Sequence, residues 1–271
     1  MKHKLSWVLL GIVLCLVLYT IVVLRSDGTV SVIFGGADGG MVTSDSVTFA
    51  DPNYVEPVSE PVDDGWPKID ITQNQYTMVR DGNALSSAWA PDVEKISGTW
   101  GMMFDATVLP QLEAMLQACR DAGHTVYVGG AYRSYSYQEK LFNGKASQIA
   151  LGMGIDDYMD PKYADAADEA RTIVMFPGCS EHQLGLAVDL YDKSYSKLVY
   201  ENMDQELFAW LDEHCAEYGF IKRYPTRKLL LTGWDEPWHY RYVGVEAATF
   251  IMERGICYEE FYAHYVEGFT Y

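Results

Sequence analysis

The sequence predicts an α+β domain in which a small, mostly antiparallel sheet is flanked by helices. Segments with helical spacing of apolar residues come mostly first, and segments typical of antiparallel strands are interleaved later in the chain. The chain has 271 residues, of which 49% are hydrophobic, and it contains 7 tryptophans. That composition is sufficient for a sizeable core, so we expect one folded domain to make up most of the chain.

An uncharged apolar run of 20 residues, LSWVLLGIVLCLVLYTIVVL, lies near the N-terminus at residues 5–24. A helix of that length spans about 30 Å, the thickness of a bilayer's hydrocarbon core. Lys2 and Lys4 precede the run and would keep the N-terminus cytoplasmic. A cleaved signal peptide is the alternative, but its apolar region is usually about 7–15 residues and ends at a small-x-small site. Because Arg25 follows directly, we expect residues 1–24 to form a cytoplasmic tip and a single-pass cell-membrane anchor, with the rest extracytoplasmic.

An acidic segment rich in glycine and proline follows at residues 25–68. No helical or strand period persists in it, so we expect a flexible, self-repelling stalk. The folded domain would then cover residues 69–271. The whole chain has 38 acidic and 20 basic residues and a net charge of −18. Nucleic acid is therefore not an expected partner, because a phosphate backbone is bound through clustered lysines and arginines.

Local patterns predict the elements of the folded domain. Apolar residues recur at helical spacing over residues 109–119, and Gly123 follows as a stop signal. Residues 125–128 are typical of a short strand, and either Ser134 or Ser136 could cap the helix that follows. Further helices are predicted at 164–171 and 205–218, and further strands at 184–190 and 238–243.

The predicted strand at residues 184–190, LGLAVDL, alternates two kinds of residue. Leucine and valine would lie on one face and pack on the core, whereas glycine, alanine and Asp189 would lie on the other. A nearly bare face that ends in a carboxylate leaves room for a metal ion and a substrate. His182 lies just before this strand and can turn back toward the same side.

Two histidines and one aspartate form a candidate zinc site. His182, Asp189 and His239 supply three ligands and leave a fourth position open, as catalytic zinc sites do. Glu236 lies three residues before His239, where it could accept a proton from zinc-bound water. Because Pro237 disfavours helix at the residue before it, we expect Glu236 on a loop that enters the strand of His239. A surface aspartate and an ordinary loop histidine explain each residue singly, but the combined pattern predicts a zinc hydrolase with one zinc per domain.

Arg133 is a candidate for binding a carboxylate. It lies between a predicted strand and a predicted helix, where the positive end of the helix and its own planar guanidinium suit an anion. A plain surface arginine remains an equal alternative. Gln138, about one turn further along, could add a hydrogen bond, although a purely structural role also explains it.

Four cysteines lie after the apolar run, and none has the CxxC spacing of a cysteine zinc site. Four cysteines allow three disulfide pairings, and the sequence leaves open which of them, if any, forms. They are Cys119, Cys179, Cys215 and Cys257.

Several of these motifs together resemble one known family. The resemblance extends over residues 69–262 and is to the VanY-type D-alanyl-D-alanine carboxypeptidases, a group that includes the related L,D-carboxypeptidases of peptidoglycan. Its motifs are Tyr132-Arg133-Ser134 with Gln138, and the segments 177–189, 218–225 and 236–242. This chain has Cys179 where the family often has threonine.

The resemblance implies a zinc carboxypeptidase that removes the C-terminal D-alanine from peptidoglycan stem peptides. It implies zinc ligands at His182, Asp189 and His239, a catalytic acid/base at Glu236, and substrate contacts at Arg133, Gln138 and Ser180. Two alternatives stay open: a peptidoglycan endopeptidase, and a zinc-containing cell-wall-binding protein without hydrolytic activity. The choice between D,D- and L,D-carboxypeptidase specificity, the oligomeric state and any role in glycopeptide resistance are left open as well.

Overall fold

The computed structural model describes residues 20–24, 30–35, 41–43 and 65–270, with the exception of residue 196. The chain divides into two compact units, Met1–Asp63 and Asp64–Tyr271. Each unit is described by itself.

The described part of the first unit is a three-stranded antiparallel sheet. Strands β1 (Thr20–Leu24), β2 (Val30–Gly35) and β3 (Met41–Thr43) pair in the order β1-β2-β3. Thr20–Leu24 is therefore a strand where we expected the end of a membrane-spanning helix. Its sequence TIVVL contains four β-branched residues, which favour extended backbone.

Most of the predicted anchor, residues 5–19, lies outside the described residues. In the part of the chain that the structure does describe, no helix combines the length and the apolar character that crossing a membrane requires. Strands β2 and β3 fall within residues 25–68, where we expected a stalk without regular structure. The rest of that segment up to residue 64 is not described.

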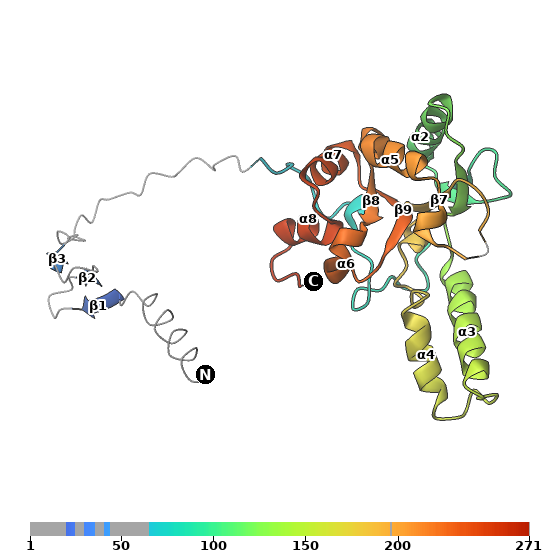
Figure 1. Ribbon diagram of the computed structural model, residues 1–271, viewed down its shortest axis with the longest axis horizontal. Coiled ribbons are helices and arrows are strands. Elements are labelled where there is room, and N and C mark those ends of the chain that lie inside the picture. Colours follow the sequence, from blue (N-terminus) through green and yellow to red (C-terminus); the bar gives the residue numbers. More distant parts are fainter. Residues whose placement is uncertain (1–19, 25–29, 36–40, 44–64, 196, 271) are drawn as a thin grey trace, which may run out of the picture. The chain divides into compact units, whose positions relative to one another are not determined.

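The second unit is built on a four-stranded antiparallel sheet, as predicted (Figure 1). Its order is β6-β7-β9-β8, so the two central strands come from distant parts of the sequence. A separate ribbon pairs β4 with β5. The strands are β4 (Val93–Lys95), β5 (Met103–Asp105), β6 (Tyr127–Gly130), β7 (Ala187–Tyr191), β8 (Phe220–Tyr224) and β9 (Glu236–Tyr242).

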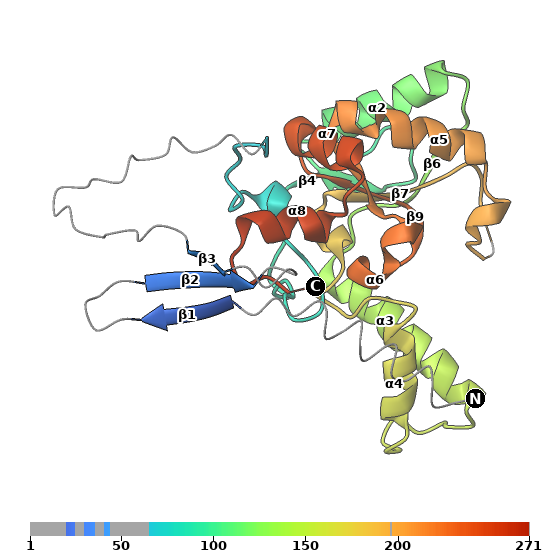
Figure 2. The same cartoon turned by 60° about the vertical axis from the view of Figure 1, so that its left-hand side comes forward.

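Helices cover this sheet and extend beyond it. Helices α2, α5 and α7 lie together above the sheet in Figure 1, whereas α3 and α4 pack on each other and project away from it in both views (Figures 1 and 2). The fold is thus α+β, as predicted. The α-helices are α2 (Leu109–Asp121), α3 (Tyr135–Gly152), α4 (Tyr163–Arg171), α5 (Gln205–His214), α6 (Leu229–Thr232), α7 (Val245–Arg254) and α8 (Tyr258–Tyr265). The 3-10 helices are η1 (Asn74–Tyr76), η2 (Glu181–Leu184), η3 (Tyr200–Asn202), η4 (Cys215–Tyr218) and η5 (Thr226–Lys228).

The two largest apolar clusters of the second unit join most of its helices to the sheet. The larger cluster joins α2 and α5 to the sheet and includes Leu112, Val188 and Phe220. The other joins η1, α7 and α8, and Trp66 packs against it. Tyr265 also donates a hydrogen bond to the Pro67 carbonyl at 2.6 Å. The folded unit therefore begins before residue 69, where we had placed its start.

Several local predictions are confirmed. Helix α2 covers the predicted residues 109–119, and Ser134 rather than Ser136 caps α3, where its hydroxyl accepts a hydrogen bond from the Tyr137 backbone N–H at 3.2 Å. The predicted helix at 205–218 is α5 continued by η4.

The strand predicted at residues 184–190 begins later than expected, at Ala187. The reason lies in Gly185, whose φ of 77° ends the 3-10 helix η2 and interrupts the alternation. As a result, Leu184 and Leu186 pack in a small cluster of their own, apart from the main core that contains Val188.

We expect Leu112→Ala to lower the free energy of unfolding by about 2–5 kcal/mol, because the fully buried Leu112 would leave a cavity in the main core. Chemical denaturation of the two proteins measures the difference. Leu230→Ala is the matched control, since Leu230 is 99% exposed and its loss should change stability by no more than about 0.5 kcal/mol. Equal effects of the two substitutions would contradict the assignment of Leu112 to the core.

Candidate metal centre

The structure brings the three predicted ligands together. His182 belongs to η2, Asp189 to β7 and His239 to β9, and all three side chains are buried. Their candidate ligand atoms lie within 4.8 Å of one another. Asp189 and His239 are directly opposite each other in the β7–β9 ladder, so strand register fixes this pair.

In each of the two imidazoles, one nitrogen faces the Asp189 carboxylate. His182 Nε2 lies 3.2 Å from Asp189 Oδ2, and His239 Nδ1 lies 3.0 Å from Asp189 Oδ1. The other nitrogen of His182, Nδ1, is 2.8 Å from the Ala131 carbonyl, and Nε2 of His239 is 3.5 Å from Glu181 Oε2. Metal-bound histidines usually contact a carbonyl or a carboxylate through their second nitrogen in this way. The donor set therefore fits a divalent cation held by two nitrogens and one carboxylate.

Gly130 provides the space for this arrangement. It lies opposite Asp189 in the β6–β7 ladder, and a Cβ built on it would overlap Asp189 Oδ2 and approach Arg133 Nη2 to 2.9 Å. Any side chain at this position would displace the carboxylate. The sequence showed a Gly129-Gly130 pair at the end of a predicted strand but gave no reason for it.

Glu236 lines the same cavity, of about 310 Å³, as the three candidate ligands. It is the first residue of β9, not part of a loop as we expected. The register between β8 and β9 shifts between Lys222 and Tyr224. Such an irregularity changes the direction of side chains along a strand, so Glu236 and His239, three residues apart, both reach the cavity.

Burial raises the pKa of Glu236 to about 7, and the negative charge of Asp189 adds to the effect, against the influence of His239. A carboxyl group with a pKa near neutrality can both accept and deliver a proton at physiological pH.

The three predicted substrate contacts also line this cavity. Arg133 Nη2 lies 3.0 Å from Asp189 Oδ2, and its side chain keeps 27% of its surface exposed. Gln138 is buried and donates a hydrogen bond from Nε2 to the Met175 carbonyl at 2.7 Å, while its Oε1 has no partner among the described residues. Ser180 is buried directly before η2. The predicted residues therefore form one constellation.

Sequence reasoning missed the role of Glu181, which is fully buried beside the metal ligands. Its Oε1 accepts from Arg223 Nε at 2.8 Å and lies 3.1 Å from Arg241 Nη1. Arg223 also makes a two-pronged pair with Glu259 of α8, at 2.7 and 3.0 Å. We call these four residues the buried charge cluster. It contains two cations and two anions, so its net charge is zero although all four groups are buried.

The buried charge cluster controls the ionisation of Glu181. Burial alone would raise its pKa, but the guanidinium groups of Arg223 and Arg241 hold the pKa well below the usual range. Glu181 is therefore a carboxylate that faces His239 Nε2. A negative charge there favours a proton on Nε2 and leaves Nδ1 available to a metal.

The four cysteines of the described chain are buried and free, so none of the possible disulfides forms. Burial, assisted by a hydrogen bond to Asp81, raises the pKa of Cys179 to about 11. That thiol is consequently unreactive at neutral pH. It does not line the cavity of the candidate ligands.

Comparisons with known proteins identify relatives of this chain. The family model for VanY, D-alanyl-D-alanine carboxypeptidase, matches residues 102–245. A D-alanyl-D-alanine carboxypeptidase of Enterococcus faecalis (strain ATCC 700802 / V583) is 36% identical over 187 residues, which cover 68% of this chain and 64% of that protein. The putative carboxypeptidase YodJ of Bacillus subtilis (strain 168) is 31% identical over 153 residues, covering 56% of this chain and 50% of YodJ. The matches thus span about half to two thirds of the length of these relatives.

Solved structures resemble the chain as well. A mutant of the vancomycin resistance D,D-pentapeptidase VanY from a VanB-type cassette, in complex with Zn(II), has a TM-score of 0.58 at 35% identity and covers 70% of this chain and 99% of that one. VanYB in complex with D-alanine-D-alanine has a TM-score of 0.56 at 36% identity, with 68% and 94% covered. The LD-carboxypeptidase LdcB has a TM-score of 0.57 at 28% identity, with 73% and 90% covered.

We expect the stability of the metal-free protein to fall with rising pH through Glu236. In the folded state Glu236 keeps its proton up to about pH 7, whereas an unfolded glutamate releases it near pH 4.3. Between these values the folded protein binds more protons, so the stabilisation is complete below about pH 4.3 and is lost as the pH rises through 7.

Denaturation of wild type and Glu236→Gln from pH 4 to pH 8 measures this effect, because the glutamine cannot titrate. The stability of wild type relative to the variant should decrease by about 3–4 kcal/mol across this range. A constant difference would show that the pKa of Glu236 is not raised.

We also expect Glu181→Gln to weaken metal binding about 10- to 100-fold, because an amide no longer fixes the proton of His239 on Nε2. Competition with a chromophoric chelator measures the affinity. Glu259→Gln is the matched control: it breaks the same buried charge cluster and destabilises the fold, but it does not contact His239. Equal losses of affinity in both variants would mean that Glu181 acts only through stability.

Proposed function

The chain belongs to the VanY family of D-alanyl-D-alanine carboxypeptidases, and from this membership we propose that it is a zinc-dependent carboxypeptidase that removes the C-terminal D-alanine from peptidoglycan stem peptides. One observation carries the proposal: two histidine nitrogens, the Asp189 carboxylate and Glu236 converge on one cavity. Relatives that contain Zn(II) or D-alanine-D-alanine support the choice of metal and substrate.

His182, Asp189 and His239 would hold one zinc ion through Nε2, a carboxylate oxygen and Nδ1. When bound, zinc would polarise the scissile carbonyl and lower the pKa of an attacking water molecule. The contacts of the second nitrogens with Ala131 and Glu181 keep both imidazoles in their binding orientation.

Glu236 acts as the general base and then as the general acid. It accepts the proton of the attacking water and delivers it to the nitrogen of the leaving D-alanine. Its raised pKa, about 7, suits both steps, since neither protonation state is strongly favoured near neutral pH.

Arg133 binds the C-terminal carboxylate of the substrate. Its guanidinium lies next to Asp189 and is partly exposed in the cavity, so it can offer two parallel N–H donors to a carboxylate. The Oε1 of Gln138, which has no partner among the described residues, can accept a hydrogen bond from a peptide N–H, and Ser180 lines the same cavity. A site that reads a free C-terminus belongs to an exopeptidase.

We expect the zinc-loaded enzyme to cleave a stem peptide with a free C-terminal D-alanine at least tenfold more efficiently than the amidated peptide. A hydrogen bond to a charged group contributes about 1.5–3 kcal/mol, and amidation removes the charge that Arg133 binds. Products are identified by mass, with tetrapeptide and pentapeptide stems compared in order to separate L,D- from D,D-cleavage.

Two variants control this experiment. Arg133→Lys keeps the charge but loses the planar fork, so it should reduce the preference for the free terminus. Glu236→Gln should keep zinc and lose about 10²–10⁴-fold in kcat. Equal cleavage of free and amidated peptides would indicate an endopeptidase, and a zinc-loaded protein that cleaves neither peptide would be a binding protein.

We further propose that residues 5–24 attach the chain to the cell membrane, with the folded unit on the extracytoplasmic side. The support is the uncharged run after Lys2 and Lys4. A helix through Leu24 requires that Thr20–Leu24 leave the β1–β2 pairing. Protease added to spheroplasts should release the folded unit, whereas a soluble mature chain that begins near Arg25 would show that the run is a cleaved signal.

A further inference from the structure

A second cavity, of about 510 Å³, lies next to the cavity of the metal ligands. Met175 lines both cavities. Tyr224 lines the second one, and its ring lies 5.1 Å from the ring of His239, between centroids. Tyr224 is also the strand partner of Glu236. A peptide with its cleaved bond at Glu236 and His239 would therefore pass Met175 and enter the second cavity.

Three charged residues that line this second cavity, Arg80, Asp81 and Arg171, have no ion-pair partner in the described part of the chain. Arg80 instead donates a hydrogen bond to the Thr270 carbonyl at 3.3 Å, which leaves Arg171 and Asp81 as the opposite charges without such a partner. Arg171, the last residue of α4, and Asp81 are both exposed, and neither forms an ion pair within 4.0 Å in the described part of the chain. Both nevertheless act on Cys179: the hydrogen bond and charge of Asp81 raise its pKa, and the charge of Arg171 lowers it. The cation and the anion thus flank Cys179 without contacting each other.

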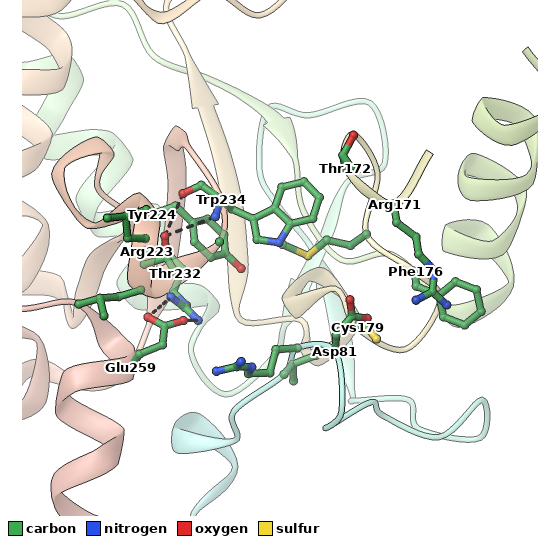
Figure 3. A pocket seen from close by; sticks show the side chains of 16 residues that line it. Asp81, Arg171, Thr172, Phe176, Cys179, Arg223, Tyr224, Thr232, Trp234 and Glu259 are labelled. Carbon is green, nitrogen blue, oxygen red and sulfur yellow. Dashed lines mark hydrogen bonds and ion pairs between the residues drawn. The ribbon is translucent and has the colours of Figure 1, made fainter. Parts of the chain in front are cut away.

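Aromatic side chains complete the lining. The guanidinium of Arg171 lies 4.5 Å from the centre of the Phe176 ring, which holds it in place. Figure 3 shows Arg171 and Phe176 on one side of the cavity, Tyr224 and Trp234 on the other, and Asp81 with Cys179 between them. The cavity therefore combines apolar walls, which suit methylene groups, with Arg171 and Asp81, a cation and an anion that are exposed, whereas Arg223 and Glu259 in the same lining pair with each other.

We propose that this second cavity binds a side chain that ends in both an ammonium and a carboxylate, carried by the substrate residue that precedes the two D-alanines. The ammonium would pair with Asp81 and the carboxylate with Arg171, while the methylene groups would pack on Phe176 and Trp234. A side chain that ends in an amine alone would satisfy Asp81 but leave Arg171 without a partner. The inference rests on the proposed carboxypeptidase function and defines its substrate more closely.

The test uses three acylated peptides that end in D-alanyl-D-alanine and differ only in the preceding side chain. One side chain ends in an ammonium and a carboxylate, one in an amine alone, and one is a neutral alkyl chain of equal length. For the full-length zinc enzyme, we expect kcat/KM to decrease in that order, by about 3- to 10-fold per step, because both charged groups are partly exposed.

Two substitutions assign each step to one residue. Arg171→Gln should remove the preference for the ammonium–carboxylate side chain over the amine. Asp81→Asn should remove the preference for the amine over the neutral side chain. Arg120→Gln is the matched control, since Arg120 is an exposed arginine near the end of α2 that does not line the second cavity. It should leave both preferences as they are in wild type.

Equal kcat/KM values for the three peptides in wild type, or unchanged preferences in Arg171→Gln and Asp81→Asn, would overturn the proposal. Failure of the carboxypeptidase function is recognised separately, with acetyl-D-alanyl-D-alanine, which lacks the preceding residue. If wild type cleaves neither this compound nor the longer peptides, calorimetric binding of the three peptides decides. The same order of affinities, lost in the two variants, supports the cavity's role, and equal affinities refute it.

Discussion

The ion pairs of Glu181 with Arg223 and Arg241 are the interaction on which the rest of the site depends. They join η2, which carries His182, to the edge strand β8 and to the central strand β9. Arg223 extends the link to Glu259 in α8. Removing one member of such a set leaves an uncompensated buried charge, which typically costs about 3–5 kcal/mol. The metal ligands are therefore held in place by interactions that cannot be lost one at a time without a large loss of stability.

The fold also explains why the two histidines present different nitrogens. His239 is directly opposite Asp189 in an antiparallel ladder, where Cα atoms are about 4.5–5.5 Å apart, so the nearer nitrogen, Nδ1, meets the carboxylate. His182 lies in the 3-10 helix η2, which precedes β7 in the chain. It reaches the same carboxylate with the nitrogen that is farther from its backbone, Nε2. Each imidazole then has its second nitrogen next to a fixed acceptor, Ala131 or Glu181.

The sequence predicted the metal ligands because they combine rare residue types at a specific spacing, and it predicted α2 because its apolar period is long. It did not predict the burial of Glu181 or Arg241, because charged residues are almost never fully buried unless paired, and the pairing partners lie far apart in the chain. The apolar run at residues 5–24 shows another limit. Hydropathy does not distinguish a helix from a strand, and the β-branched end at Thr20–Leu24 forms a strand.

The charged residues beside the metal ligands and the two proposed to bind the substrate side chain differ in burial and in pairing. Charges beside the metal ligands are buried and mutually paired, so a change there disturbs the fold as well as the reaction. Arg171 and Asp81 are exposed, and surface substitutions of this kind usually change stability by about 0.5 kcal/mol or less. Arg171 and Asp81 can therefore be exchanged at little cost in stability. Binding energy from a remote part of the substrate can still act on the reaction, because it positions the bond to be cleaved next to Glu236.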